Sequence, residues 1–140
     1  NPKLGLTLSL HEWQNVIFVL REAKLLGSLY HTAKQASCYD DYPDYAHKLA
    51  DAIKAGKAEQ GVLICGSGIG ISIAANRHTH IRAALCQSGL EATLSRQHND
   101  ANVLVLGARI IGAERAKDCL HRFMATVFEG GRHQKRVDKI

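Results

Sequence analysis

The chain has 140 residues, 46 % of them hydrophobic, which is enough for one domain with a buried core and too few for two. No apolar run reaches the length of a membrane span and no secretory leader is visible, so we expect a cytoplasmic protein with one domain over residues 1–140 and no membrane contact. A net charge of +5 favours an anionic partner, which leaves nucleic acid and a small phosphorylated molecule open.

The four cysteines point to the same compartment. None belongs to a CxxC pair, and their spacing indicates neither a zinc site nor a disulfide framework. A reducing cytoplasm is the simplest interpretation, and we expect neither a metal nor a cofactor.

The first forty residues predict a strand, a helix and a second strand. The strand covers residues 3–8 and the second one covers residues 28–32. Between them, Ser9 and Glu12 stand at capping-box spacing, which predicts a helix that ends near Gly27. Its buried face would carry Trp13, Val16, Ile17 and Leu20.

From Asp41 onward, apolar strands and amphipathic helices alternate regularly. A helix capped by Asp41 ends at Gly56, and two more are predicted at 89–97 and 113–128. The strands are fully apolar and lie at 61–65, 81–86 and 102–107. The pattern predicts an α/β fold, with a mostly parallel sheet of about five strands covered by helices on both faces. Ligands bind such sheets outside the carboxyl ends of the strands.

The segment "GVLICGSGIGISIAANR", residues 61–77, places a cysteine at such a strand end. Glycines 66, 68 and 70 allow the backbone to approach a ligand, and their N–H groups can bind an anion beside the following helix. A thiolate at Cys65 could attack a carbonyl, or it could remove a proton from carbon while the amides hold the oxyanion. The alternative is a buried cysteine in a tight turn. The spacing matches neither the dinucleotide fingerprint nor a P-loop.

Histidines and arginines supply the other candidates. His98 in "SRQHNDANVL" suits proton transfer, although a lone loop histidine is more often unremarkable. We interpret His78 and His80 as surface residues rather than metal ligands. Arg132 and Arg136 share a face if the tail is helical. With Arg109 they favour a phosphorylated small molecule over nucleic acid, for which no reading motif is visible.

Residues 41–140 resemble the ribose-5-phosphate isomerase B family, which includes the galactose-6-phosphate isomerase subunits. The matching pieces occur in the family's order, and they are "DYPDYA", "GVLICGSGIGISIAANR", "IRAALC", "LSRQHNDANVLVLGAR" and "GGRHQKRV". The resemblance implies a Rossmann-like α/β/α sandwich and a homodimer or larger assembly with shared active sites. It also implies metal-free isomerisation of ribose 5-phosphate and ribulose 5-phosphate, a step of the pentose phosphate pathway in carbohydrate metabolism.

The resemblance also assigns roles to residues. Cys65 is implied to be the base, and the amides of Gly66, Gly68 and Gly70 to hold the enediolate oxygen. Ser67 is implied to contact the sugar at the catalytic centre, and His98 to open the furanose ring. The substrate contacts implied are Tyr42 and Asn99, and the phosphate clamp implied is Arg109, Arg132 and Arg136.

One part of the family pattern is missing from the first forty residues. The family places an Asp-His pair after its first strand, which would fall near Leu8 and Ser9, yet no aspartate precedes Asp40. His11 is the only nearby histidine that could compensate, either from the mouth of a strand or from a helix that would turn it away. Divergence of this segment and an altered sequence both remain open.

Three functions follow from these residues. The first is the pentose phosphate isomerase, with an isomerase of a six-carbon sugar phosphate as its variant. The second is a non-catalytic or weakened sugar-phosphate-binding homologue. The third, on chemistry alone, is a thiol hydrolase that uses Cys65 and His98.

Overall fold

The computed structural model describes residues 16–20, 29–31 and 41–140. Its sheet has five strands in the order β2-β1-β3-β5-β4. The strand bounds are β1 Val16–Leu20, β2 Leu29–His31, β3 Gln60–Cys65, β4 Ala83–Leu85 and β5 Val103–Gly107. The strand predicted at 3–8 and the position of His11 lie outside the described residues.

The sheet is parallel at one side and antiparallel at the other. β5 runs parallel to both β3 and β4, whereas β1 runs antiparallel to both β2 and β3. The parallel part therefore has three strands, and the prediction of a mostly parallel sheet of five is wrong for its first two strands. The strand predicted at 28–32 is confirmed as β2.

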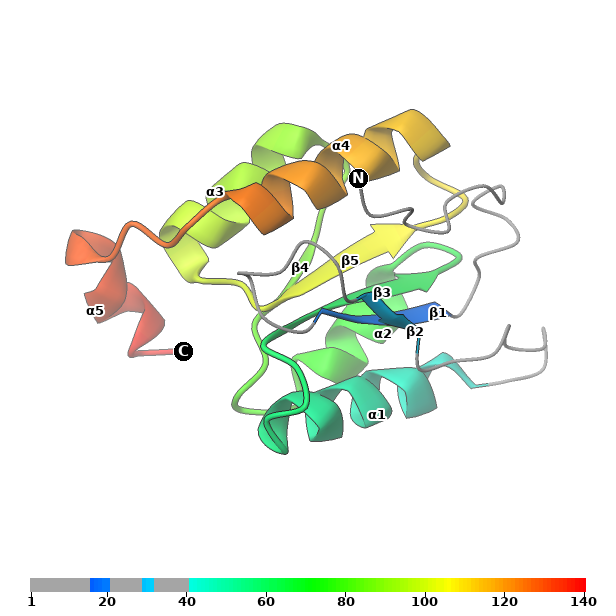
Figure 1. The fold of residues 1–140 in the computed structure, drawn as a ribbon, viewed down its shortest axis with the longest axis horizontal. Coiled ribbons are helices and arrows are strands. Elements are labelled where there is room, and N and C mark those ends of the chain that lie inside the picture. The colour runs from blue at the N-terminus through cyan, green and yellow to red at the C-terminus, as the bar shows by residue number, and fades with distance from the viewer. Residues whose placement is uncertain (1–15, 21–28, 32–40) are drawn as a thin grey trace.

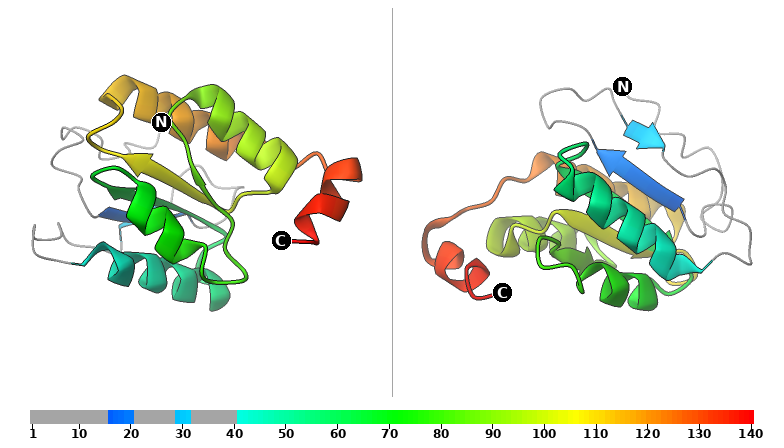
Figure 2. Two further views of the ribbon diagram at one scale, coloured as in Figure 1. Left: turned by 180° about the vertical axis from the view of Figure 1, so that it is seen from behind. Right: turned by 90° about the horizontal axis from the view of Figure 1, so that it is seen from below.

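Two helices cover each face of the parallel strands (Figure 1). One pair is α1, Tyr42–Lys54, with α2, Ile69–Ala75; the other is α3, Gly89–Asn99, with α4, Ala113–Ala125. A short η2, Gly131–His133, and α5, Gln134–Val137, follow α4 and lie beyond one end of the layers (Figures 1 and 2). None of the helices among the described residues is long and apolar enough to cross a membrane.

The core divides into two clusters, because successive side chains of a strand point to opposite faces. Val62, Ile64, Leu104 and Leu106 pack with α4 residues such as Phe123. On the other face, Leu63, Cys65, Val103 and Val105 pack with Leu49 and Ala50 of α1 and Ile71 of α2. Burial on both faces confirms the three-layer α/β/α arrangement and explains why these strands lack polar alternation.

Two predicted helix positions need correction. The helix predicted after Ser9 is wrong at its buried face, because residues 16–20 form β1, paired with β3. The run Val-Ile-Phe-Val-Leu satisfies helical spacing, yet its β-branched and aromatic residues favour a strand. The last helix ends at Ala125, since Thr126 is extended with φ −95° and ψ 130°. Val127, which the prediction places within this helix, is 78 % exposed.

Candidate active site

The glycine loop between β3 and α2 contacts a thiol through its backbone. Cys65 is the last residue of β3 and is 5 % exposed. Gly68 has φ 78°, a left-handed conformation that glycine adopts at little cost, and it directly precedes α2. In this conformation the Gly68 N–H donates a hydrogen bond to Cys65 Sγ at 3.2 Å. The helix predicted to follow the glycine loop is confirmed as α2, which begins at Ile69.

The loop after β5 is hydrogen-bonded to the glycine loop and holds it in place. The N–H of Ala108 donates to the carbonyl of Cys65, and the N–H of Arg109 donates to the carbonyl of Gly66, both at 2.9 Å. Gly107 pairs with Cys65 in the parallel ladder. A side chain at Gly107 would collide with the backbone carbonyl of Ser67, so this contact requires glycine.

Three more predicted residues gather at the glycine loop. The Arg109 guanidinium lies over Gly66, with its Nε 3.4 Å from where a Gly66 Cβ would stand. The Tyr42 ring, at the start of α1, packs against Gly70 so closely that a side chain there would overlap it. Ser67 is exposed, and its Oγ accepts from the Ile69 N–H at 3.2 Å.

This arrangement joins a base to an anion site. A thiol lies next to the Gly68 amide, and an exposed guanidinium lies over the adjacent Gly66, at the carboxyl ends of neighbouring strands. Such a group can remove a proton from carbon and hold the negative charge that develops on an adjacent oxygen.

The other described cysteines do not compete for this role. Burial raises the pKa of the Cys86 thiol to about 12, and Cys119 and Glu91 act in the same direction. Burial also raises the pKa of Cys119, with Asp118 as the next cause. Both thiols stay protonated at neutral pH and lie in the α3–α4 side of the core.

A second group of predicted residues lies at the opposite edge of the sheet. His98 and Asn99 end α3 just before β5 begins at Val103, so they lie at the amino end of a strand whose carboxyl end faces the glycine loop. Arg132 and Arg136 follow in η2 and α5, and both are exposed. Neither has an ion pair with any described residue. A single chain therefore brings together only half of the predicted site.

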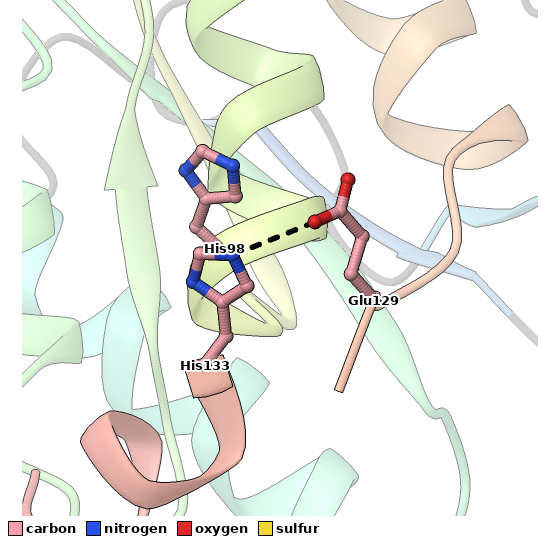
Figure 3. Close-up of side chains that lie close together, drawn as sticks. All are labelled: His98, Glu129 and His133. Carbon is pink, nitrogen blue, oxygen red and sulfur yellow. Dashed lines mark ion pairs between the residues drawn. The ribbon is translucent and has the colours of Figure 1, made fainter. Parts of the chain in front are cut away.

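His133 and Glu129 belong to this second group, and the sequence analysis missed both. The His133 ring stacks on His98, with centroids 4.2 Å apart and planes 9° from parallel (Figure 3). Glu129 Oε2 lies 3.4 Å from His133 Nε2. Burial lowers the pKa of His133, as do His98 and Arg132, whereas Glu129 opposes the shift. The only sequence signal for His133 is its place between two candidate arginines.

The same three side chains offer ligand atoms within 4.8 Å of one another. An imidazole binds a metal ion through a lone pair in the plane of its ring. Two parallel stacked rings cannot both aim such a lone pair at one ion. One ring would have to leave the stack before the trio could chelate.

Comparison with known proteins identifies the family and the fold. A family model described as Ribose/Galactose Isomerase matches residues 14–140. The chain belongs to the ribose/galactose isomerase family. The predicted family and the Rossmann-like fold are thereby confirmed, and the chain is an isomerase.

Individual relatives of this isomerase family agree closely with the chain. Ribose-5-phosphate isomerase B of Escherichia coli is 51 % identical over 100 residues, which cover 71 % of this chain and 67 % of the relative. D-erythrulose-4-phosphate isomerase of Pectobacterium atrosepticum is 48 % identical over 99 residues, 71 % of this chain and 65 % of the relative. The crystal structure of a ribose 5-phosphate isomerase from Thermotoga maritima is 46 % identical, with a TM-score of 0.78 over 81 % of this chain and 78 % of that one.

Proposed function

We propose that this protein interconverts ribose 5-phosphate and ribulose 5-phosphate. The observation that carries the proposal is the hydrogen bond from Gly68 N–H to Cys65 Sγ in a glycine loop whose Gly66 lies beside the Arg109 guanidinium. The family relationship supplies the substrate class, since relatives about 50 % identical are named for sugar phosphate isomerisation. This reaction belongs to the pentose phosphate pathway, and a cytoplasmic location fits it.

In the proposed mechanism, the Cys65 thiolate removes the proton from C2 of open-chain ribose 5-phosphate. The C2–H electrons form the C1–C2 double bond of an enediolate, and the aldehyde oxygen at C1 takes the negative charge. The N–H groups of the glycine loop stabilise that oxygen, which carries a full charge only in the intermediate. The hydroxyl proton on O2 passes to O1, so that the negative charge moves to O2. The thiol then returns the carbon-bound proton to C1 as the O2 electrons form the ketone at C2. Ser67 contacts the sugar hydroxyls, and Tyr42 forms the side wall.

Ring opening and the phosphate grip require a second copy of the chain in this proposal. His98, Arg132 and Arg136 lie at the far edge of the sheet from Cys65, beyond reach of one bound sugar. In a two-fold symmetric dimer, each Cys65 half meets the His98 half of the partner. His98 then opens the furanose, Asn99 contacts the sugar, and the phosphate lies between Arg109 of one subunit and the arginine pair of the other.

Exposed apolar side chains around the glycine loop support an interface there. Ile69 and Ile73 of α2 are 55 % and 59 % exposed, and Ile110 beside Arg109 is 53 % exposed. Ile69 and Ile73 are four residues apart and share one helix face. An apolar patch beside a half-built site is typical of a surface that a partner covers.

The direct test is an isomerase assay of the purified protein with ribose 5-phosphate, erythrulose 4-phosphate and six-carbon aldose phosphates. We expect the highest kcat/KM with ribose 5-phosphate. A higher value with another sugar phosphate would reassign the substrate. Saturable binding of ribose 5-phosphate without turnover would support the non-catalytic homologue instead.

Mixing two inactive variants tests the shared site. Cys65→Ala and His98→Ala are each expected to be inactive, because each removes one half of every site. After denaturation and refolding of an equal mixture, half of the dimers are heterodimers with one intact site, so activity should return to about a quarter of wild type. A mixture that stays as inactive as its components would place both residues in one subunit's site.

The arginine pair should recognise the phosphate group rather than the sugar. We expect Arg132→Ala or Arg136→Ala to weaken ribose 5-phosphate binding on the order of tenfold to a hundredfold, because each removes a charge-assisted contact to the phosphate. Calorimetric titration should show no change with unphosphorylated ribose. Arg115→Ala, on the exposed start of α4, is the matched control. Equal weakening of both ligands would rule out the phosphate role.

A further inference from the structure

A pair of histidines joins α1 to the segment after α2, away from the residues placed in the active site. His47 Nδ1 and His78 Nε2 are 2.7 Å apart. Their rings are T-shaped, with centroids 5.0 Å apart and planes at 68°. His47 is exposed and His78 half-buried, so solvent reaches the pair. The sequence analysis interpreted His78 as a surface residue, and nothing in the proposed isomerisation uses it.

The two rings meet through their nitrogen atoms, unlike the stacked His98 and His133. At 2.7 Å one nitrogen must carry a hydrogen and the other must accept it, so the two ring nitrogens point toward each other. When the donor ring carries its hydrogen on its other nitrogen instead, two lone pairs are directed at the same space. A tetrahedral or octahedral ion with bonds of about 2.0–2.1 Å needs two such nitrogens about 3 Å apart, so a small opening of the pair would admit it.

One neighbouring carboxylate, that of Asp51, favours a cation at this place. Asp51 lies four residues after His47 on α1, and therefore on the same helix face. It has no ion pair with any described residue. Its charge acts on His78 to raise the pKa, although burial, His47, His80 and Lys54 together lower it. A neutral imidazole is the form that binds metal.

His80 fixes the segment that carries His78. Its Nε2–H donates to the carbonyl of Ala50 on α1 at 2.8 Å, so this nitrogen is already in use. The His80 ring lies 5.9 Å from that of His78, with the ring planes at 71°. The loop is therefore held against α1 at two points, which orders the His47–His78 pair before any ion binds.

We propose that His47 and His78 bind a divalent transition-metal ion such as Ni²⁺ or Zn²⁺, with Asp51 turning in as a third ligand. Two imidazoles and one carboxylate suit these ions and not Mg²⁺ or Ca²⁺, which prefer oxygen ligands. The ion would connect α1 to the end of α2. Because Tyr42 of α1 packs on Gly70 of α2, the two helices joined by the ion are also those that border the glycine loop.

The test is a calorimetric titration of metal-free protein with Ni²⁺ at pH 7.5. We expect His47→Gln and His78→Gln each to weaken Ni²⁺ binding at one site at least roughly tenfold, because loss of a direct ligand should cost no less than loss of an outer-shell partner. Asp51→Asn should weaken Ni²⁺ binding at the same site by a smaller factor. Ni²⁺ should also raise the melting temperature of the wild type more than that of either variant. At pH 5.5 protons should displace the metal.

Two control variants separate this site from other histidines. His121→Gln changes an exposed histidine on α4, and His133→Gln removes the trio with His98 and Glu129; both should retain the site. Retention of wild-type Ni²⁺ affinity by both His47→Gln and His78→Gln would overturn the proposal, as would the absence of any Ni²⁺ binding by the wild type. Neither result depends on isomerase activity, so the proposal stands or falls separately from the proposed function.

Discussion

Replacement of Cys65 by alanine should lower kcat for ribose 5-phosphate by about 10² to 10⁴, the usual contribution of a general base. The thiol accepts a hydrogen bond from the Gly68 amide. Alanine removes the base and leaves the loop backbone in place. KM should change little, because the proposed phosphate and hydroxyl contacts come from other side chains. Steady-state kinetics on the purified variant measures both quantities.

Two further cysteine variants sharpen this test. Cys65→Ser keeps an acceptor for the Gly68 N–H and should still be strongly impaired, because an alcohol is far harder to deprotonate than a thiol. Cys86→Ala changes a thiol that is 1 % exposed and packs on the α3–α4 side of the core, so the folded protein should keep its rate. Near wild-type turnover by Cys65→Ala would refute its role as the base.

Replacement of Gly107 by alanine should reduce kcat about a hundredfold without removing any side chain that contacts the sugar. The new methyl group would lie 2.7 Å from the carbonyl carbon of Ser67 and would collide with its oxygen, so the glycine loop must move. A displacement of about 1 Å at a catalytic group can cost on the order of 10²-fold in rate. The same shift weakens the backbone hydrogen bonds between the loops, so the melting temperature should also fall.

Gly112→Ala is the matched control for this variant. The position has φ −82° and ψ 165°, which alanine adopts, and a Cβ there meets no atom of the described residues within 4 Å. Activity and melting temperature should stay near wild type. Equal behaviour of the two alanine variants would show that the close contact at Gly107 does not position the loop.

The elements from Asp41 onward were predicted well from the sequence, because there each strand is apolar and each helix is amphipathic. The helix starts at Tyr42 and Ile69 and the strand ending at Cys65 follow from local patterns. Residues 16–20 defeated that reasoning, since five consecutive apolar residues satisfy both periods. Pairing with β3 decides for the strand, and pairing partners distant in the chain are invisible to a local pattern.

Part of the candidate site was predictable for a similar reason. A strand followed by a glycine loop marks an edge of the sheet, and this placed Cys65 near Arg109. His98 and Cys65 are separated because His98 precedes the amino end of β5, whereas Cys65 lies beside its carboxyl end. The stacking of His98 on His133 depends on how the C-terminal segment returns to α3. His11 lies outside the described residues, so its compensation for the missing Asp-His pair remains a prediction.

The division of the predicted site between opposite edges of the sheet has a consequence for how output depends on expression. If every complete site needs two chains, folding alone produces no catalyst, and the encounter of two folded chains does. At concentrations well below the dimer dissociation constant, the total rate then rises with the square of the amount of protein rather than in proportion to it. Halving the supply of chain would quarter the flux in that regime, so the strength of the interface sets the dose at which the enzyme begins to work.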